Sequence, residues 1–228
     1  LFEAGVIPDM KGPFGVVLDV NETLFSLDAI DPIFDRWGIA GQRDLWFART
    51  LRNGFALTVA GQYRSFPEVA RHAFVSMAPD RISPAEADEL LGAFGALEPH
   101  PEVRAALTSL RDARVPVATL SVGNATNVER LFARAGLDDL VTTHLSCEQV
   151  SRWKPAPEPY RMACQVLESE PHETWMVAAH AWDLAGAHGV GMRTAWLSRL
   201  EERYDENFPP PDVTGADLLD TVTRLLDD

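Results

Sequence analysis

Short apolar runs alternate with longer amphipathic stretches over the second half of the chain. The expected strands cover residues 115–120, 141–145, 174–178 and 193–197. The expected helices between them cover residues 124–135, 155–167 and 183–188. Gly136 and Gly189 follow two of these helices and are typical helix ends. Strands that alternate with helices form a parallel sheet covered on both faces, so the pattern predicts an α/β fold.

One earlier strand, Gly15-Val16-Val17-Leu18, is separated from this pattern by a long helical region over residues 27–98. Apolar side chains recur there at helical spacing, at Leu45, Trp46, Leu51, Phe55, Leu57, Val69, Phe74 and Val75. Ser83-Pro84-Ala85-Glu86 is a strong helix start, with an N-cap serine, an early proline and a glutamate three residues on. We therefore predict a Rossmann-like core of residues 1–25 and 99–228, with residues 26–98 inserted as a helical cap.

Composition and charge narrow the classes of function. The chain has 228 residues and is 46% hydrophobic, which is enough for a large core and makes disorder an unlikely state. Its formal net charge of −14 argues against nucleic acid and anionic membrane surfaces as partners, because both bind basic patches. No apolar stretch approaches the roughly 18 residues of a membrane span.

Three further segments bear on compartment and organisation. Residues 1–5 lack the basic start of a signal peptide. Cys147 and Cys164 have no metal-like or Cys-x-x-Cys spacing, which favours two buried thiols in a reducing compartment, and we expect the cytoplasm. The acidic stretch 212–228 is typical of a solvated helix.

Four polar residues stand just after expected strands: Asp19, Ser121, Lys154 and Asp183. In an open parallel sheet this edge binds ligands, and a carboxylate there can act as a nucleophile. Taken alone, Asp19 is equally well explained as a helix cap. Ser121 alone is better explained as a turn residue, Lys154 as a solvated charge and Asp183 as a helix cap. All four in this order are a much stronger signal, because parallel strand ends share one edge.

With these residues in place, the chain resembles the haloacid dehalogenase (HAD) superfamily of hydrolases over about residues 14–225. The motifs that carry the resemblance are Leu18-Asp19-Val20-Asn21-Glu22-Thr23-Leu24, Thr119-Leu120-Ser121-Val122-Gly123-Asn124, Trp153-Lys154-Pro155 and Ala179-His180-Ala181-Trp182-Asp183. Within the superfamily the chain is most similar to the L-2-haloacid dehalogenase branch. The features that carry this likeness are Trp182-Asp183 followed by Gly186-Ala187, Tyr160 six residues after Lys154, and residues 138–146, which resemble the stretch before the lysine in that branch. The resemblance also implies a possible homodimer.

The resemblance implies a role for each site residue. Asp19 would displace halide from the α-carbon by in-line attack and form an ester, which water then hydrolyses to a hydroxy acid. Lys154 would keep Asp19 ionised, and Asp183 would pair with Lys154 and help to position water. Thr23 and Ser121 would hydrogen-bond the nucleophile. Tyr160 would brace the site, and the cap would close over the substrate.

Two positions argue against phosphatase chemistry. Superfamily phosphatases carry a second aspartate two residues after the nucleophile, which protonates the leaving group, and here that residue is Asn21. They also carry an acidic residue four before the last aspartate, which helps to hold Mg²⁺, and here it is Ala179. Both differences match an enzyme that attacks carbon without a cofactor or metal. Mg²⁺ is expected only under the phosphatase alternative.

Other positions depart from the haloacid branch. By alignment, Phe47 stands where the branch has the arginine that binds the substrate carboxylate. Arg49 or Arg52 are possible replacements, although helical geometry places both on other faces than Phe47. Two asparagines of the branch become Val122 and His180, and a serine becomes Ala178. These changes predict a bulkier or less charged substrate, or a leaving group other than halide.

His180 has two interpretations. As a neutral imidazole near the ester it could be the general base for hydrolysis, and alternatively it is a hydrogen-bonded histidine that shapes the pocket. Aromatic side chains could form an apolar wall around a small substrate, or could be plain core. The expected substrate-binding residues are Asn21, Trp46, Phe47, Val122, Tyr160 and Trp182.

Other classes fit less well. Ser121, His180 and Asp183 suggest a serine hydrolase, but Ser121 lacks the Gly-x-Ser-x-Gly elbow. No Gly-x-Gly-x-x-Gly follows the first strand, which argues against dinucleotide binding. A phosphatase, a silent ligand-binding member and a hydrolase of another carbon bond, such as a strained ring, remain open. The prediction is a metal-independent hydrolase of a small 2-halo acid with an aspartate nucleophile.

Overall fold

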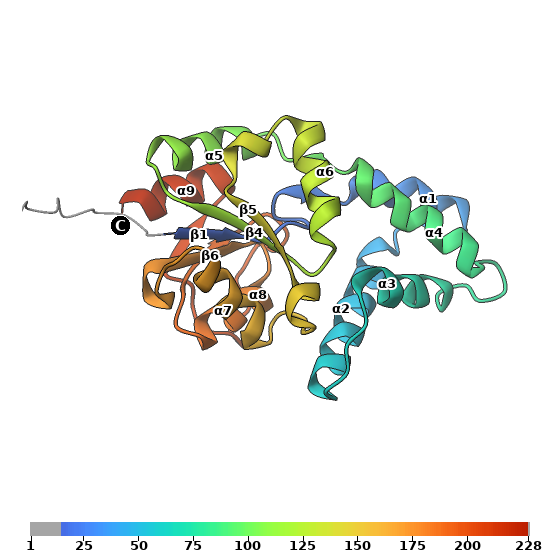
Figure 1. Ribbon diagram of the computed structural model, residues 1–228. Coiled ribbons are helices and arrows are strands. Elements are labelled where there is room, and N and C mark those ends of the chain that lie inside the picture. The colour runs from blue at the N-terminus through green and yellow to red at the C-terminus, as the bar shows by residue number, and fades with distance from the viewer. Residues whose placement is uncertain (1–14, 228) are drawn as a thin grey trace, which may run out of the picture.

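A parallel six-stranded sheet forms the centre of the computed structural model, which describes residues 15–227 (Figure 1). Its strands are β1 (Gly15–Leu18), β4 (Val117–Ser121), β5 (Thr143–Ser146), β6 (Thr174–Ala178), β7 (Arg193–Leu197) and β8 (Val213–Gly215). Their order is β5-β4-β1-β6-β7-β8. The N-terminal run 1–5 lies outside the described residues. The α/β fold expected from the alternating pattern is confirmed.

Helices cover both faces of this sheet (Figure 1). They are α5 (Val103–Asp112), α6 (Ala125–Ala135), α7 (Pro157–Val166), α8 (Ala181–Gly189) and α9 (Leu218–Asp227). Alternate residues of β1 enter different layers: Val16 and Leu18 pack with Leu107 of α5, whereas Val17 packs with Leu184 of α8. Every residue of β1 is buried, as expected for a central parallel strand.

A helical insert, residues 31–93, lies between β2 (Phe25–Ser26) and β3 (Glu98–Pro99), which pair antiparallel. Its helices are α1 (Asp31–Arg36), α2 (Arg43–Val59), α3 (Phe66–Val75) and α4 (Pro84–Ala93). The capping box expected at α4 is formed, since Ser83 N donates to the Glu86 carboxylate at 2.6 Å. Figure 1 shows the insert beside the core, with α2 and α3 beyond the end of α6.

Trp153 holds the insert against the core. It precedes Lys154 in the loop after β5, and its ring is buried against Phe66 of α3, with centroids 6.0 Å apart. Its indole Nε1 donates to Arg64 O at 2.9 Å, and its backbone N donates to Thr58 Oγ1 at 3.1 Å. Both acceptors belong to the insert. This loop of the core therefore helps to fix where the insert sits.

The C-terminal stretch differs from the sequence prediction. Residues 212–228 are not simply a solvated helix, because they begin with the edge strand β8 and continue into α9. Leu218, Val222 and Leu225 are buried at helical spacing, so one face of α9 covers the sheet while its acidic residues face water. No helix within residues 15–227 is long and apolar enough to cross a membrane.

The packing of Trp153 yields a prediction for Gly54 of α2. A Cβ at Gly54 would lie 2.3 Å from Trp153 ring carbons, whereas a Cβ at Gly92 of α4 meets nothing within 4 Å. We expect Gly54→Ala to destabilise the fold by about 1–3 kcal/mol through overpacking. Gly92→Ala should stabilise it by up to about 1 kcal/mol through helix propensity. Urea denaturation of both variants measures this, and equal effects would contradict the proposed packing.

Candidate active site

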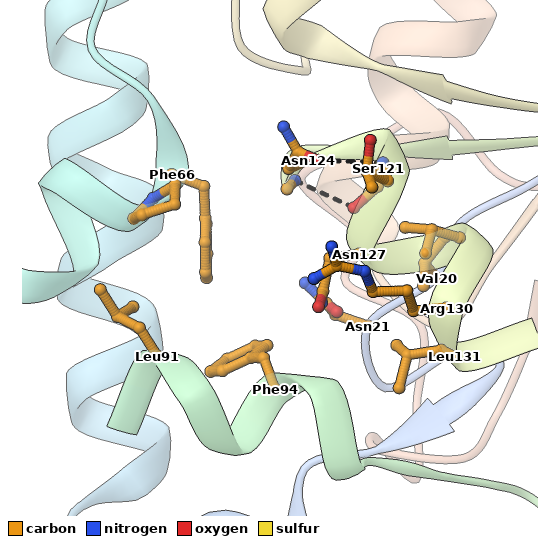
Figure 2. Close-up of a pocket in the computed structure, with 14 residues that line it drawn as sticks. Val20, Asn21, Phe66, Leu91, Phe94, Ser121, Asn124, Asn127, Arg130 and Leu131 are labelled. Carbon is orange, nitrogen blue, oxygen red and sulfur yellow. Dashed lines mark hydrogen bonds between the residues drawn. The ribbon is translucent and has the colours of Figure 1, made fainter. Parts of the chain in front are cut away.

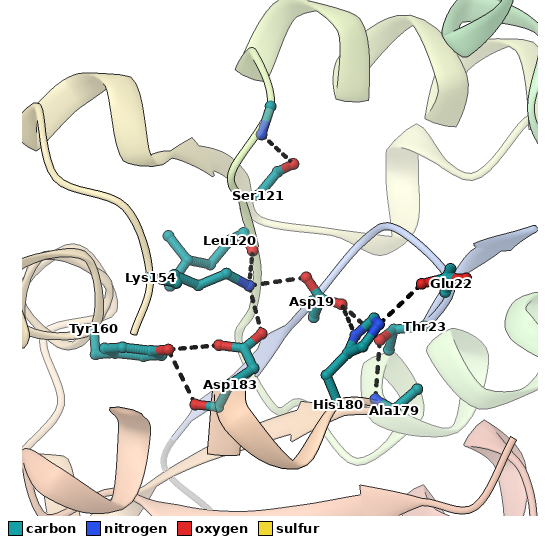
Figure 3. Close-up of polar contacts among 11 residues, drawn as sticks. Asp19, Glu22, Thr23, Leu120, Ser121, Lys154, Tyr160, Ala179, His180 and Asp183 are labelled. Atoms are coloured by element: carbon teal, nitrogen blue, oxygen red, sulfur yellow. Dashed lines mark hydrogen bonds and ion pairs between the residues drawn. The ribbon is translucent and has the colours of Figure 1, made fainter. Parts of the chain in front are cut away.

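The carboxyl edge of the sheet brings four of the expected residues to one place. Asp19 follows β1, Ser121 ends β4, and Asp183 lies in the first turn of α8 after β6. Lys154 reaches them from the loop between β5 and α7 (Figure 3). Asp19 is held at the strand end because its backbone N donates to Val177 O at 3.1 Å. The shared edge of parallel strands thus produces the cluster that the order of the residues predicted.

Lys154 is at the centre of this cluster. Its Nζ donates to Asp19 Oδ1 at 2.8 Å, to Asp183 Oδ2 at 2.5 Å and to Leu120 O at 2.9 Å. Lys154 and Asp183 are fully buried, and the Asp19 side chain is 7% exposed. An ammonium group has three protons to donate, so every donor of Lys154 is used.

Burial and charge act in opposite directions on these groups. Burial alone would raise the pKa of Asp19, but the Lys154 ammonium and the His180 ring hold it well below its usual range. Burial would lower the pKa of Lys154, but Asp183 and Asp19 raise it. Burial raises the pKa of Asp183, and Lys154 opposes this. Asp19 is therefore the carboxylate that is held ionised.

Thr23 contacts the nucleophile candidate as expected, and Ser121 does not. Thr23 Oγ1 donates to Asp19 Oδ2 at 2.7 Å and accepts from Ala179 N at 3.0 Å, which orients the carboxylate. Ser121 Oγ instead accepts a hydrogen bond from Gly123 N at 2.9 Å. The turn after β4 explains this difference, because its backbone amide takes the hydroxyl. Within the described residues, no hydrogen bond joins Ser121 to Asp19.

Tyr160 braces Asp183. The buried phenol donates to Asp183 Oδ1 at 2.6 Å and to Asp183 O at 3.0 Å. Burial and the adjacent carboxylate raise the pKa of Tyr160 well above its ordinary value, so the phenol stays a donor. A Cβ at Gly186 of α8 would lie 2.5 Å from Tyr160 Oη, so the glycine makes room for this contact. Tyr160 is therefore a bracing residue and is too buried to form a substrate wall.

His180 lies between two carboxylates (Figure 3). Its Nε2 is 2.9 Å from Glu22 Oε2, and its Nδ1 is 3.6 Å from Asp19 Oδ2. Burial lowers the pKa of His180, but Asp19 and Glu22 outweigh burial and raise it to about 10. The ring is therefore an imidazolium at neutral pH. The sequence interpretation concerned a neutral imidazole beside the Asp19 ester, and it did not include Glu22.

Glu22 was missed by the sequence analysis. Its backbone has φ 63°, and its N donates to Phe25 O at 2.8 Å in the tight turn after Asp19. A non-glycine residue in this left-handed region costs about 1 kcal/mol. An acidic side chain in the turn after the nucleophile, with a histidine expected at the same sheet edge, was the available signal.

Two cavities flank the cluster. The His180 cavity, about 570 Å³, is lined by Glu22, Phe47, Arg52, Phe55, His180 and Trp182, among others. The Ser121 cavity, about 310 Å³, is lined by Asn21, Phe66, Phe94, Ser121 and Arg130, among others, and lies between α3, α4 and α6 (Figure 2). The His180 ring contacts two of the expected wall residues, with ring centroids 6.3 Å from Phe47 and 5.5 Å from Trp182.

Three expected substrate-binding residues line neither cavity. Trp46 is fully buried inside the insert, where its ring packs on Phe34 and its Nε1 donates to Ala70 O at 3.0 Å. Val122 is 4% exposed, and Tyr160 braces Asp183. The plain-core interpretation therefore describes Trp46.

Arg52 lines the same cavity as Phe47, although the two side chains are about 140° apart around α2, as the helical spacing predicted. Both line the His180 cavity, because its wall spans a wide arc of the helix that includes Leu51 and Phe55. Arg49 lines neither cavity.

The two arginines of the His180 cavity differ in their partners. Arg43 already pairs with Asp28 at 2.7 Å, and with Asp31 and Asp44 at 3.0 Å. The Arg52 guanidinium bonds only the neutral amide oxygen of Asn53 among described residues. Arg52 is therefore the cation available to a ligand.

The donor set does not fit a magnesium site. Asp19 and Asp183 are the two carboxylates at this edge, and each already uses one oxygen to bind the Lys154 ammonium. Ala179 supplies no side-chain oxygen. Within residues 15–227, no group of three or more His, Cys, Asp or Glu side chains is arranged to hold a metal ion.

Known proteins share this architecture. The family model of haloacid dehalogenase-like hydrolases matches residues 15–191. (S)-2-haloacid dehalogenase 2 of Pseudomonas sp. (strain CBS-3) is 28% identical, over 92% of this chain and 96% of that protein. Haloacetate dehalogenase H-2 of Moraxella sp. (strain B) is 24% identical, over 95% of this chain and 99% of that protein. The structure of an L-2-haloacid dehalogenase from Xanthobacter autotrophicus with chloropropionic acid covalently bound has the same fold, with TM-score 0.84, 23% identity, and coverage of 94% and 98%.

Removal of the central cation gives a pH-dependent prediction. Lys154→Met should destabilise the fold at pH 7 by about 3–5 kcal/mol, because it leaves buried carboxylates without a partner. The pKa of Asp19 is depressed in the folded protein, so its stabilisation exists above the unfolded pKa near ~4 and is lost as pH falls further. In the variant the buried carboxylates face no cation, so burial raises their pKa above the unfolded value and they take up protons as pH falls from 7. The deficit of the variant should therefore narrow as pH falls from 7 toward about 4.

Urea denaturation at several pH values measures this deficit. Arg161→Met, at an exposed position of α7, is the control and should change stability by less than about 0.5 kcal/mol. A deficit that is equally large at pH 7 and pH 4 would contradict the electrostatic account.

Proposed function

This chain belongs to the haloacid dehalogenase-like hydrolases, and we propose that it hydrolyses the carbon–halogen bond of small 2-halo acids through an ester on Asp19. The observation that carries the proposal is the buried Asp19 carboxylate, held ionised by Lys154 beside an apolar cavity. Relatives named as 2-haloacid and haloacetate dehalogenases, aligned over nearly their whole length, support this substrate class.

The reaction has two steps. An oxygen of Asp19 attacks the α-carbon, an ester bond forms, and the halide leaves with the electrons of the broken carbon–halogen bond. Water then attacks the carbonyl carbon of the ester, and the hydroxy acid leaves. Lys154 and Thr23 hold the carboxylate in a fixed orientation, which lowers the cost of reaching the attack geometry.

The leaving group decides between dehalogenation and phosphoryl transfer. A halide is a weak base and needs no proton, whereas an alkoxide leaving from a phosphate ester does. Asn21 cannot supply that proton, and Ala179 offers no side-chain oxygen to a metal ion. Both facts support a reaction without a metal cofactor.

The His180 cavity suits a small halo acid. Phe47, Phe55 and Trp182 offer apolar contacts to the alkyl group and the halogen, and the ring centroids of Phe55 and Trp182 are 5.0 Å apart. Arg52 supplies the cation that the substrate carboxylate needs. In this proposal the arginine of the haloacid branch is replaced from the same helix, one turn beyond Phe47.

The remaining parts of the proposal concern the partner, the oligomeric state and the cellular compartment. The partner is a small-molecule substrate, and a homodimer remains a prediction. The free, buried thiols Cys147 and Cys164 are compatible with a reducing compartment, and we assign the reaction to the cytoplasm on that basis.

Halide release tests the proposed reaction. Wild-type protein should release chloride from L-2-chloropropionate or a haloacetate at the same rate with and without EDTA. Asp19→Asn should abolish release, with intact mass used to verify that the amide has not hydrolysed back to aspartate. No release from any haloacid would contradict the proposal, and Mg²⁺-dependent turnover of a phosphate ester would replace it with a phosphatase.

Substrate anchoring gives a separate prediction for Arg52. Arg52→Ala should raise KM for a haloacid about tenfold or more while kcat falls much less. The reason is that the lost contact to the substrate carboxylate is made equally in the ground state and in the transition state. Arg49→Ala, on the same helix but outside both cavities, is the matched control and should leave KM unchanged. Equal KM values for Arg52→Ala and wild type would exclude Arg52 as the anchor.

A further inference from the structure

Glu22, His180 and Asp19 form a row of three groups, of which Glu22 and His180 line the His180 cavity and Asp19 lies behind them (Figure 3). Glu22 Oε2 lies 2.9 Å from His180 Nε2, and His180 Nδ1 lies 3.6 Å from Asp19 Oδ2. The side chains of Glu22 and His180 are each 12% exposed. Nδ1 is buried and has no hydrogen-bond partner among the described residues. One nitrogen is therefore fixed by Glu22, and the other faces the nucleophile with its bonding capacity unused.

The backbone at Glu22 is strained, and this strained residue carries the carboxylate that contacts His180. Its φ of 63° is a conformation that glycine adopts without cost, whereas a residue with a Cβ does not. Strained residues concentrate at functional sites, where the surrounding structure holds them in place. The turn itself does not need a carboxylate, because its hydrogen bond to Phe25 O comes from the backbone N of Glu22. The carboxylate instead serves His180.

We propose that Glu22 is a positioning residue that makes His180 the general base for hydrolysis of the Asp19 ester. This inference rests on the proposed function. Glu22 accepts a hydrogen bond from Nε2–H and so fixes the tautomer in which Nε2 keeps its proton and Nδ1 carries the lone pair. The arrangement is a carboxylate that orients a histidine toward a reacting water, which is the logic of hydrolytic triads.

The charge on Asp19 determines when His180 acts. In the resting enzyme two carboxylates flank the ring and keep it protonated. When Asp19 becomes a neutral ester, the ring keeps only Glu22 as an anionic partner, and the Nδ1 proton leaves to solvent through the cavity that His180 lines. The other charged groups around this space are Arg43, Asp44, Arg52 and Glu201 on the cavity wall, and Lys154 across Asp19.

The hydrolytic step then balances. Nδ1 takes one proton from water as the water oxygen bonds to the carbonyl carbon of Asp19. The bond from that carbon to the substrate oxygen breaks, and Nδ1 returns the proton to the departing alkoxide. The Asp19 carboxylic acid then gives its own proton to His180, which restores the carboxylate and the imidazolium. No oxidant, reductant or metal is needed.

Single-turnover kinetics with 2-chloropropionate test this assignment, with intact mass used to follow the esterified enzyme. Glu22→Gln should leave ester formation within about threefold of wild type and slow ester hydrolysis about tenfold or more, so that the ester accumulates. Glu168→Gln is the matched control, because Glu168 is exposed and remote from the site. Its backbone is also in the left-handed region, with φ 53°. This control should leave both steps unchanged.

Two readouts separate positioning from a merely structural role. Hydrolysis in the wild type should rise with pH as His180 loses its proton, and in Glu22→Gln this rise should move to lower pH because an anion beside the ring is gone. The double variant Glu22→Gln/His180→Asn should hydrolyse its ester no more slowly than His180→Asn alone. Equal slowing of both steps by Glu22→Gln, or additive losses in the double variant, would overturn the inference.

An NMR titration of His180 in the free enzyme tests the coupling without any substrate. The titration midpoint should fall in Glu22→Gln relative to wild type, and equal midpoints would overturn the inference. Wild-type protein that forms no ester from any haloacid would instead overturn the proposed function. The two failures are therefore distinguishable.

Discussion

The buried ammonium of Lys154 is the interaction on which the rest of the site depends. It bonds the ends of three different segments: Asp19 after β1, Leu120 O in β4 and Asp183 at the start of α8. Two buried carboxylates would repel each other at this edge without it, and a lone buried ammonium would be equally costly. The three groups are therefore stable only together. The same contacts that make this edge stable keep Asp19 ionised and ready to react.

The fixed position of Lys154 also affects the helical insert, because the preceding residue, Trp153, packs against it. Lys154 is directed into the core cluster, while its neighbour Trp153 packs between α2 and α3 of the insert. The position of the insert is thus coupled to the position of the ammonium. Because α2 carries Phe47 and Arg52, the loop that holds Asp19 ionised also sets where the cavity wall lies. Gly54 of α2 is small because Trp153 occupies the space of its missing side chain.

The sequence was sufficient for features that depend on local pattern. It predicted β6 and β7 within the observed limits, and strand order along the chain brought Asp19, Lys154 and Asp183 together. It failed where a result depends on packing between distant segments. Edge strand β8, the cavity that Arg52 shares with Phe47 and the Ser121 hydroxyl turned toward Gly123 all depend on such packing.

The most instructive failure of the sequence analysis is that it missed Glu22, because the role of Glu22 depends on a charge balance that no local pattern contains. The nucleophile loses its negative charge when the ester forms, and a fixed positive charge next to it would then lack a partner. His180 can release a proton at that point, whereas Lys154 cannot, since Asp183 still binds it. One proton leaves as one negative charge is lost, so the net charge of the buried cluster is the same before and after ester formation. A titratable cation held by Glu22 therefore lets a buried site tolerate a nucleophile whose charge must change in every cycle.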